Sequence, residues 1–86
     1  MRIEKKVWPE LFKELASGEK TFELRLDDFE CKQGDVLVLR EWDPKAKQYT
    51  GKSLEKNVGF VLKIKDVKFF LKEDVEKFGY QVISLR

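Results

Sequence analysis

The chain has 86 residues, 42% of them hydrophobic and 40% charged, and its 18 basic against 16 acidic residues leave a net charge of +2. These values predict one folded domain with a small core and exclude a disordered chain, while the small net charge does not by itself indicate nucleic acid. With Cys31 as the single cysteine and no histidine, an internal disulfide, a structural zinc site and histidine-based catalysis are excluded. We therefore expect no metal and no organic cofactor.

No apolar run approaches the roughly 20 residues needed to cross a bilayer. The first ten residues, MRIEKKVWPE, also lack the apolar stretch of a secretory signal. A lone cysteine fits a reducing compartment. These features predict a cytoplasmic protein with no membrane partner.

A short strand over residues 3–7 is followed by the pattern of an amphipathic helix. The apolar positions of that helix fall at i, i+3, i+4 and i+7, namely Trp8, Leu11, Phe12 and Leu15. Pro9 suits the first helical position, and Gly18 suits the residue just after the helix. We expect Trp8 to lie in the core or in a cleft wall.

Strand patterns recur along the rest of the chain, over residues 20–28, 35–42, 57–67 and 80–85. Residues 43–52, with Pro44 and Gly51, read as a hairpin loop, and residues 69–79 contain one or two possible helical turns. Many short strands in so small a chain favour a partly closed barrel, which leaves no edge strand exposed. The pattern predicts an α+β fold, with a mostly antiparallel β-barrel and one N-terminal amphipathic helix.

The stretch GEKTFELR, residues 18–25, places ionic residues inside one of these predicted strands. Glu23 and Arg25 are two apart, so they project from the same face about 7 Å apart, and Lys20 stands at the entrance of the strand. A carboxylate can hold a guanidinium in one orientation, and an oriented arginine beside a lysine makes a small pocket for a phosphate or a base edge. The alternative is an exposed ion-pair face, in which each pair contributes about 0.2–1 kcal/mol.

The same stretch matches the GxKxxExR pattern of the ASCH (activating signal cointegrator homology) superfamily at Gly18, Lys20, Glu23 and Arg25. Further segments, among them QGD, REWDP…YTG and the terminal GYQVISL, resemble a family of small ASCH-like proteins of bacteria and phages. The resemblance covers nearly the whole chain and implies a single ASCH/PUA-like domain over residues 1–86. It also implies a PUA-like β-barrel that binds RNA or a nucleotide in a cleft between the first helix and the barrel.

The resemblance assigns a role to each residue of the motif. Lys20 and Arg25 are the expected anion contacts. Glu23 either orients Arg25 or accepts a hydrogen bond from a base, and Gly18 allows a tight passage from helix to strand. No residue is expected to be catalytic if the protein is a binding module.

One ASCH branch resembles an enzyme, an amidohydrolase that removes the acetyl group of N4-acetylcytidine. That branch uses a lysine at the position of Lys20, a nucleophilic threonine at the position of Glu23, and a later glutamate. This chain keeps the lysine but has no threonine at that position, and Thr21 lies about 7 Å away along the strand. Lys20 and Glu23 could still form an acid–base pair, so a nucleoside amidohydrolase is the alternative function.

A second candidate surface follows from Arg40 and Trp42, which share one strand face, and from Tyr49 across the hairpin. Cations interleaved with aromatic rings are typical of surfaces that bind single-stranded RNA. The alternative is that the two rings cap the barrel. A protein-interaction adaptor remains a third possible function, and the sequence leaves the oligomeric state open.

Overall fold

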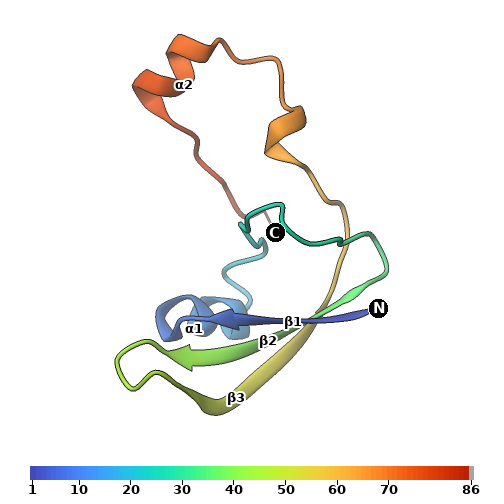
Figure 1. Ribbon diagram of the computed structural model, residues 1–86, viewed down its shortest axis with the longest axis vertical. Helices are drawn as coiled ribbons and strands as arrows, with labels where there is room; N and C mark the ends of the chain where they lie inside the picture. Colours follow the sequence, from blue (N-terminus) through green and yellow to red (C-terminus); the bar gives the residue numbers. More distant parts are fainter. Residues whose placement is uncertain (86) are drawn as a thin grey trace.

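The structure is a computed structural model that describes residues 1–85. Its elements, in chain order, are β1 (Arg2–Val7), α1 (Pro9–Ser17), β2 (Val36–Asp43), β3 (Gln48–Asn57), the single 3₁₀ turn η1 (Ile64–Asp66) and α2 (Lys72–Phe78) (Figure 1). The predicted α+β class is therefore confirmed, and the elements form one open three-stranded sheet with two α-helices.

The sheet has the order β1-β2-β3 and combines one parallel with one antiparallel strand pair. β1 runs parallel to β2, with Lys6 opposite Arg40, because α1 returns the chain to the start of the sheet in the same direction. β2 and β3 form an antiparallel hairpin that places Trp42 opposite Tyr49. The expectation of a mostly antiparallel sheet is thus correct for β2–β3 and wrong for β1–β2.

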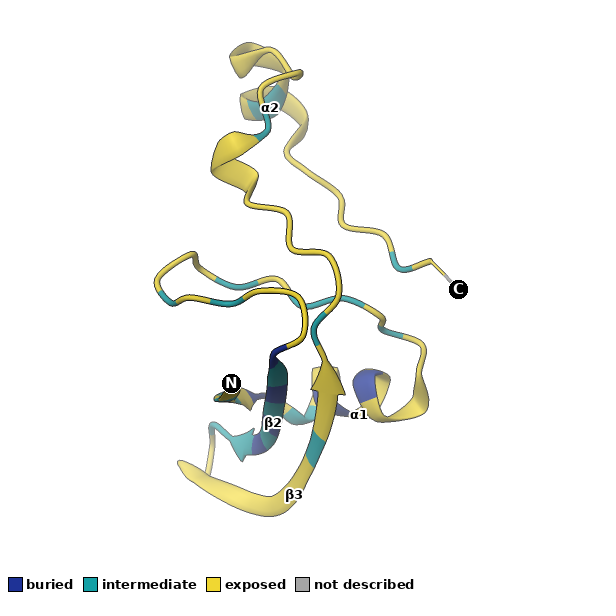
Figure 2. Ribbon diagram, turned by 90° about the vertical axis from the view of Figure 1, so that its right-hand side faces the viewer, coloured by how far each residue is buried: buried dark blue, intermediate teal, exposed yellow. Residues whose placement is uncertain are grey.

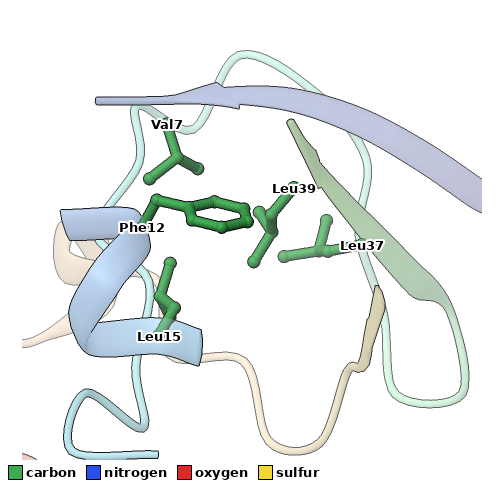
Figure 3. Close-up of a cluster of buried hydrophobic side chains, with 5 residues drawn as sticks. All are labelled: Val7, Phe12, Leu15, Leu37 and Leu39. Carbon is green, nitrogen blue, oxygen red and sulfur yellow. The ribbon is translucent and has the colours of Figure 1, made fainter. Parts of the chain in front are cut away.

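One face of the sheet packs on α1 and holds the core (Figure 3). Strand alternation turns Leu37 and Leu39 of β2 toward the helix, and Leu39 is fully buried. Phe12 points from α1 toward Leu39, and Val7 and Leu15 complete the cluster. The opposite face of the sheet carries Arg40 and Trp42 of β2.

The predicted helix is confirmed, with Pro9 in its first turn and Gly18 as its C-cap in the left-handed conformation (φ 86°). Of the predicted apolar stripe, Phe12 and Leu15 are buried, while Trp8 and Leu11 are 56% and 49% exposed. The prediction for Trp8 as a core residue is wrong, because this residue is the extended N-cap and does not follow the helical stripe.

Three of the predicted strands, over residues 20–28, 57–67 and 80–85, do not form, except that Asn57 is the last residue of β3. The sheet therefore stays open instead of closing into a barrel. Alternation in a sequence indicates which side chains share a face, but a strand also needs a hydrogen-bonded neighbour, which alternation does not identify. Conversely, β3 begins at Gln48, inside the predicted loop 43–52, because the turn occupies only residues 44–47.

Residues 58–85, here called the arm, extend away from the sheet and carry η1 and α2 (Figures 1 and 2). Most of the arm is exposed, including Phe60, Phe69 and Phe78, which are 74–87% exposed. The Cα radius of gyration of 14.7 Å is larger than the roughly 12 Å of a compact domain of this length. The apolar side chains of the arm are therefore available to pack elsewhere.

Both ends of the arm are attached to the rest of the structure, residues 1–57, here called the body. At its start, the Val58 amide donates to the carbonyl of Asp35 at 2.8 Å. At its end, the Thr21 amide donates to Ser84 Oγ at 3.3 Å, and the Thr21 hydroxyl donates to the Leu85 carbonyl at 3.2 Å. These bonds hold the last residues of the arm beside the GEKTFELR stretch.

Candidate functional site

Lys20, Glu23 and Arg25 come together as an ionic triad in which Glu23 lies between the two cations. Lys20 Nζ is 2.9 Å from Glu23 Oε1, and Arg25 Nε is 2.8 Å from Glu23 Oε2. The side chains are 12%, 16% and 29% exposed, respectively. The alternative of an exposed ion-pair face is wrong, because all three groups are sheltered from water.

Local hydrogen bonds position the triad on the chain. Gly18 turns the chain out of α1, and the Lys20 amide then donates to the Glu14 carbonyl at 3.0 Å. The Lys20 ammonium also donates to the Phe22 carbonyl at 2.6 Å. At the other end, Arg25 Nη2 donates to the main-chain carbonyl of Lys6 at 2.9 Å, which anchors the guanidinium to β1.

The triad lines a large cavity of about 1210 Å³ between the body and the arm. Its remaining wall is mainly apolar and includes Leu15, Leu37, Phe22, Phe70, Tyr80 and Val82. Gly18 also lines this cavity. An ionic cluster in a mostly apolar wall interacts more strongly with a charged ligand than the same cluster would in bulk water.

The triad retains hydrogen-bond donors beyond those that Glu23 uses. Lys20 has three ammonium protons and Arg25 has five N–H groups. Within residues 1–85, Lys20 donates to two acceptors and Arg25 to two. One carboxylate against two cations leaves a net charge of +1, so the arrangement can accept an anion without losing its internal pairs.

Arg40, Trp42 and Tyr49 also come together, but on the face of the sheet opposite α1, and they do not line the cavity. The Trp42 and Tyr49 rings meet edge to face with their centroids 5.0 Å apart, and the Arg40 guanidinium lies 3.8 Å from the Tyr49 centroid. Lys6 Nζ lies 3.8 Å above the Trp42 ring. We call Lys6, Arg40, Trp42 and Tyr49 the sheet-face cluster.

The sequence analysis missed Lys6, which contacts both groups through different atoms. Its carbonyl binds Arg25 of the triad, and its ammonium covers Trp42 of the sheet-face cluster. Lys6 could not be found from the sequence because its position depends on the parallel register of β1 and β2, which sets it opposite Arg40. The local pattern of either strand does not show this register.

Asp35 is a buried carboxylate that the sequence analysis also missed. It accepts hydrogen bonds from the Lys32 amide at 3.0 Å and from the N-terminal ammonium of Met1 at 3.2 Å. These donors, the amide first, hold the pKa of the Asp35 carboxyl below its usual value of 3.8. The carboxylate therefore fastens the loop before β2 to the start of β1.

Burial raises the pKa of the Cys31 thiol, and the nearby charge of Asp35 acts in the same direction. A raised pKa keeps the thiol protonated and poorly nucleophilic at neutral pH. Within residues 1–85, three or more potential metal ligands do not gather at any point. No helix in the same range has the length and apolar character to cross a membrane.

Residues 4–83, almost the entire chain, match the family model described as a domain of unknown function, DUF3850. The chain belongs to the DUF3850 family. The matched range of this DUF3850 domain includes the ionic triad, the sheet-face cluster and most of the arm. No curated protein and no solved structure matches the chain.

Proposed function

We propose that this DUF3850 protein binds RNA or a nucleotide, and that the ionic triad contacts its phosphate. The observation that carries the proposal is the position of Glu23, which holds Lys20 and Arg25 side by side in the wall of the cavity. Two cations held together by one acid are oriented before the ligand arrives, so binding does not require them to lose further side-chain freedom. Their remaining N–H groups suit the oxygens of a phosphate.

The apolar part of the cavity wall suits the base of such a ligand. Phe22 and Tyr80 line the same cavity as Lys20 and Arg25. Unstacked bases gain about 1–3 kcal/mol from stacking on an aromatic ring, whatever their sequence. A phosphate at the triad with its base against these rings would use both the charged and the apolar parts of the cavity.

We further propose an ASCH-type, PUA-like fold in which the arm closes onto the body as additional strands of a barrel. Three observations support closure: the alternating apolar pattern of residues 57–67, the exposed apolar side chains of the arm, and the bonds from Thr21 to Ser84 and Leu85. Closure would bury apolar side chains of the arm such as Phe60 and Phe78 and would pair residues 80–85 with the motif segment, while the part of the cavity beside the triad, with Phe22 and Tyr80, would stay open to a ligand. The free thiol of Cys31 agrees with a cytoplasmic location for such a protein.

The test is a salt-titrated binding assay with a fluorescein-labelled oligouridylate, read by fluorescence anisotropy. We expect affinity to fall linearly with the logarithm of salt concentration, and Lys20→Ala and Arg25→Ala to weaken binding about tenfold or more and to reduce the slope by about one each. Lys13→Ala, which removes an exposed lysine from α1, is the matched control. Absence of salt-dependent binding to any RNA would overturn the proposal and favour a protein-interaction adaptor.

The 2.9 Å contact between Lys20 Nζ and Glu23 Oε1 in a sheltered cavity supports a second candidate, a nucleoside amidohydrolase. Such a pair can transfer a proton during hydrolysis of an amide. The Thr21 hydroxyl donates to the Leu85 carbonyl and not to this pair, so within residues 1–85 no base is bonded to it that could activate it. Release of cytidine from N4-acetylcytidine, and its loss in Lys20→Ala, would establish this activity; unchanged substrate would reject it.

A further inference from the structure

The sheet-face cluster is not used by a ligand that stays inside the cavity. We infer that a single RNA strand passes around the carboxyl end of β1 at Lys6, so that the ionic triad and the sheet-face cluster bind successive nucleotides of the same strand. The inference rests on the proposed function and adds to it a second contact surface, a bridging residue and a minimum ligand length.

Lys6 provides the geometric link between the two surfaces. Its carbonyl oxygen accepts Arg25 Nη2 at 2.9 Å, and its ammonium lies 3.8 Å from the Trp42 centroid and 5.8 Å from the Tyr49 centroid. One residue thus contacts the triad with its main chain and the cluster with its side chain. β1 is an outer strand of the sheet, so a ligand can pass from one face to the other around it.

The charges of the sheet-face cluster point to an anion. Lys6 and Arg40 are directly paired across β1 and β2, and like charges in this position repel each other. Arg40 has one acidic neighbour, Glu4, at 3.8 Å, and within residues 1–85 Lys6 forms no ion pair. A phosphate between the two cations would relieve the repulsion, and it is the group that recurs along an RNA strand.

The rings beside these cations make a surface for bases. Trp42 and Tyr49 meet at 78°, so their planes face different directions, and Tyr49 is 37% exposed. The Arg40 guanidinium is a further planar group on which a base can stack. β1 carries Lys6, β2 carries Arg40 and Trp42, and β3 carries Tyr49, so cations and rings lie side by side across the sheet and can meet the phosphates and bases of one RNA strand.

A site with two surfaces predicts that affinity depends on the length of the RNA. We expect a labelled octauridylate to bind at least tenfold more tightly than a labelled diuridylate, because the dinucleotide reaches only one surface. Comparable affinities for the two lengths would overturn the inference while leaving the proposed function intact. Failure of both lengths to bind would overturn the proposed function itself.

Lys6→Ala is the decisive variant, since it removes the ammonium but keeps the main-chain carbonyl that anchors Arg25. We expect Lys6→Ala and Tyr49→Ala each to weaken octauridylate binding about fivefold to tenfold and so to reduce the ratio between the octauridylate and diuridylate affinities. Lys13→Ala again controls for the loss of one positive charge. Equal octauridylate affinity for Lys6→Ala and Lys13→Ala, or a change confined to the melting temperature, would show that the cluster is only structural and would overturn the inference.

Discussion

Glu23 determines how the two cations of the triad lie relative to each other. Without its carboxylate, Lys20 would retain the Phe22 carbonyl and Arg25 would retain the Lys6 carbonyl, but nothing would hold the two side chains together. The carboxylate of Glu23 therefore fixes the positions of the two cations, and it also lowers the net charge of the triad from +2 to +1. This makes its replacement more informative than the removal of either cation.

We expect Glu23→Gln to lower the free energy of unfolding by about 1.5–3 kcal/mol, the range for hydrogen bonds to charged groups. The variant keeps the shape of the side chain, but its neutral amide has only one oxygen and cannot accept hydrogen bonds from both Lys20 and Arg25. Urea denaturation of the wild type and the variant measures the change. An unchanged midpoint would mean that the triad contributes nothing to folding.

Asp35 should make the stability of the protein sensitive to acid. Because its pKa is lower in the folded state than its usual 3.8, the unfolded chain binds more protons below that value. The stabilisation is complete above about pH 3.8 to 4 and is lost as the pH falls through the folded-state pKa. Urea denaturation between pH 2 and 6 would follow this loss.

Asp35→Asn should flatten the acid dependence. The matched control is Glu55→Gln, since the pKa of Glu55 is also lowered, by its hydrogen bonds to Arg2, but this pair is exposed. We expect the smaller effect from Glu55→Gln. A larger effect from the exposed pair would contradict the role given to Asp35.

The contacts within the triad were predictable from sequence, because Lys20, Glu23 and Arg25 are close together in the chain. Spacing alone predicted a shared face, and the resemblance to the ASCH motif added Gly18. Lys6 and Asp35 were not predictable in this way, since their partners, Trp42 of β2 and the N-terminal ammonium, are distant in sequence. Contacts between residues so far apart in the chain can be predicted only once the register of the strands is known.

At the scale of elements, Gly18 joins α1 to the motif in a conformation that L-residues rarely adopt. We expect Gly18→Ala to lower the free energy of unfolding by about 1 kcal/mol, the usual penalty of a left-handed backbone for a residue with a Cβ atom. Gly59→Ala is the control, because Gly59 has no positive φ and its added methyl group would meet open space. Equal effects of the two substitutions would contradict this account.

Prediction was most accurate for elements whose signal is local. The helix over residues 9–17 follows from its apolar spacing, Pro9 and Gly18, and β2 follows from an apolar run that is buried against α1. Residues 20–28 alternate regularly but have no strand neighbour, and Leu24 and Leu26 of their predicted apolar face are 65% and 80% exposed. Periodicity alone therefore did not decide which segments became strands, because a strand also needs a partner.

For the whole molecule, small-angle X-ray scattering tests closure of the arm. An open arm corresponds to a Cα radius of gyration of 14.7 Å, whereas a closed domain of this length would approach about 12 Å. We expect the measured value to fall toward the closed limit, since closure removes exposed apolar groups such as Phe60 and Phe78 from water. A value that stays at the open limit would contradict closure.

Phe78→Asp provides a second measurement of the same prediction. In an open arm this side chain is exposed, and its replacement should leave the melting temperature unchanged. In a closed domain it would lose a buried aromatic contact, and we expect a fall of several degrees. Gln81→Asp, at an exposed polar residue of the arm, controls for the added negative charge.

The crossover from β1 to β2 has a consequence for the order of folding. Arg2 pairs with Val36, whereas the β2–β3 hairpin joins neighbours along the chain, so the hairpin closes a shorter loop. During synthesis β1 leaves the ribosome first, yet it must wait for β2 before it has a partner. The segment that carries Lys20, Glu23 and Arg25 lies inside this crossover, so the bond that anchors Arg25 to the Lys6 carbonyl takes its final position only when β1 docks on β2.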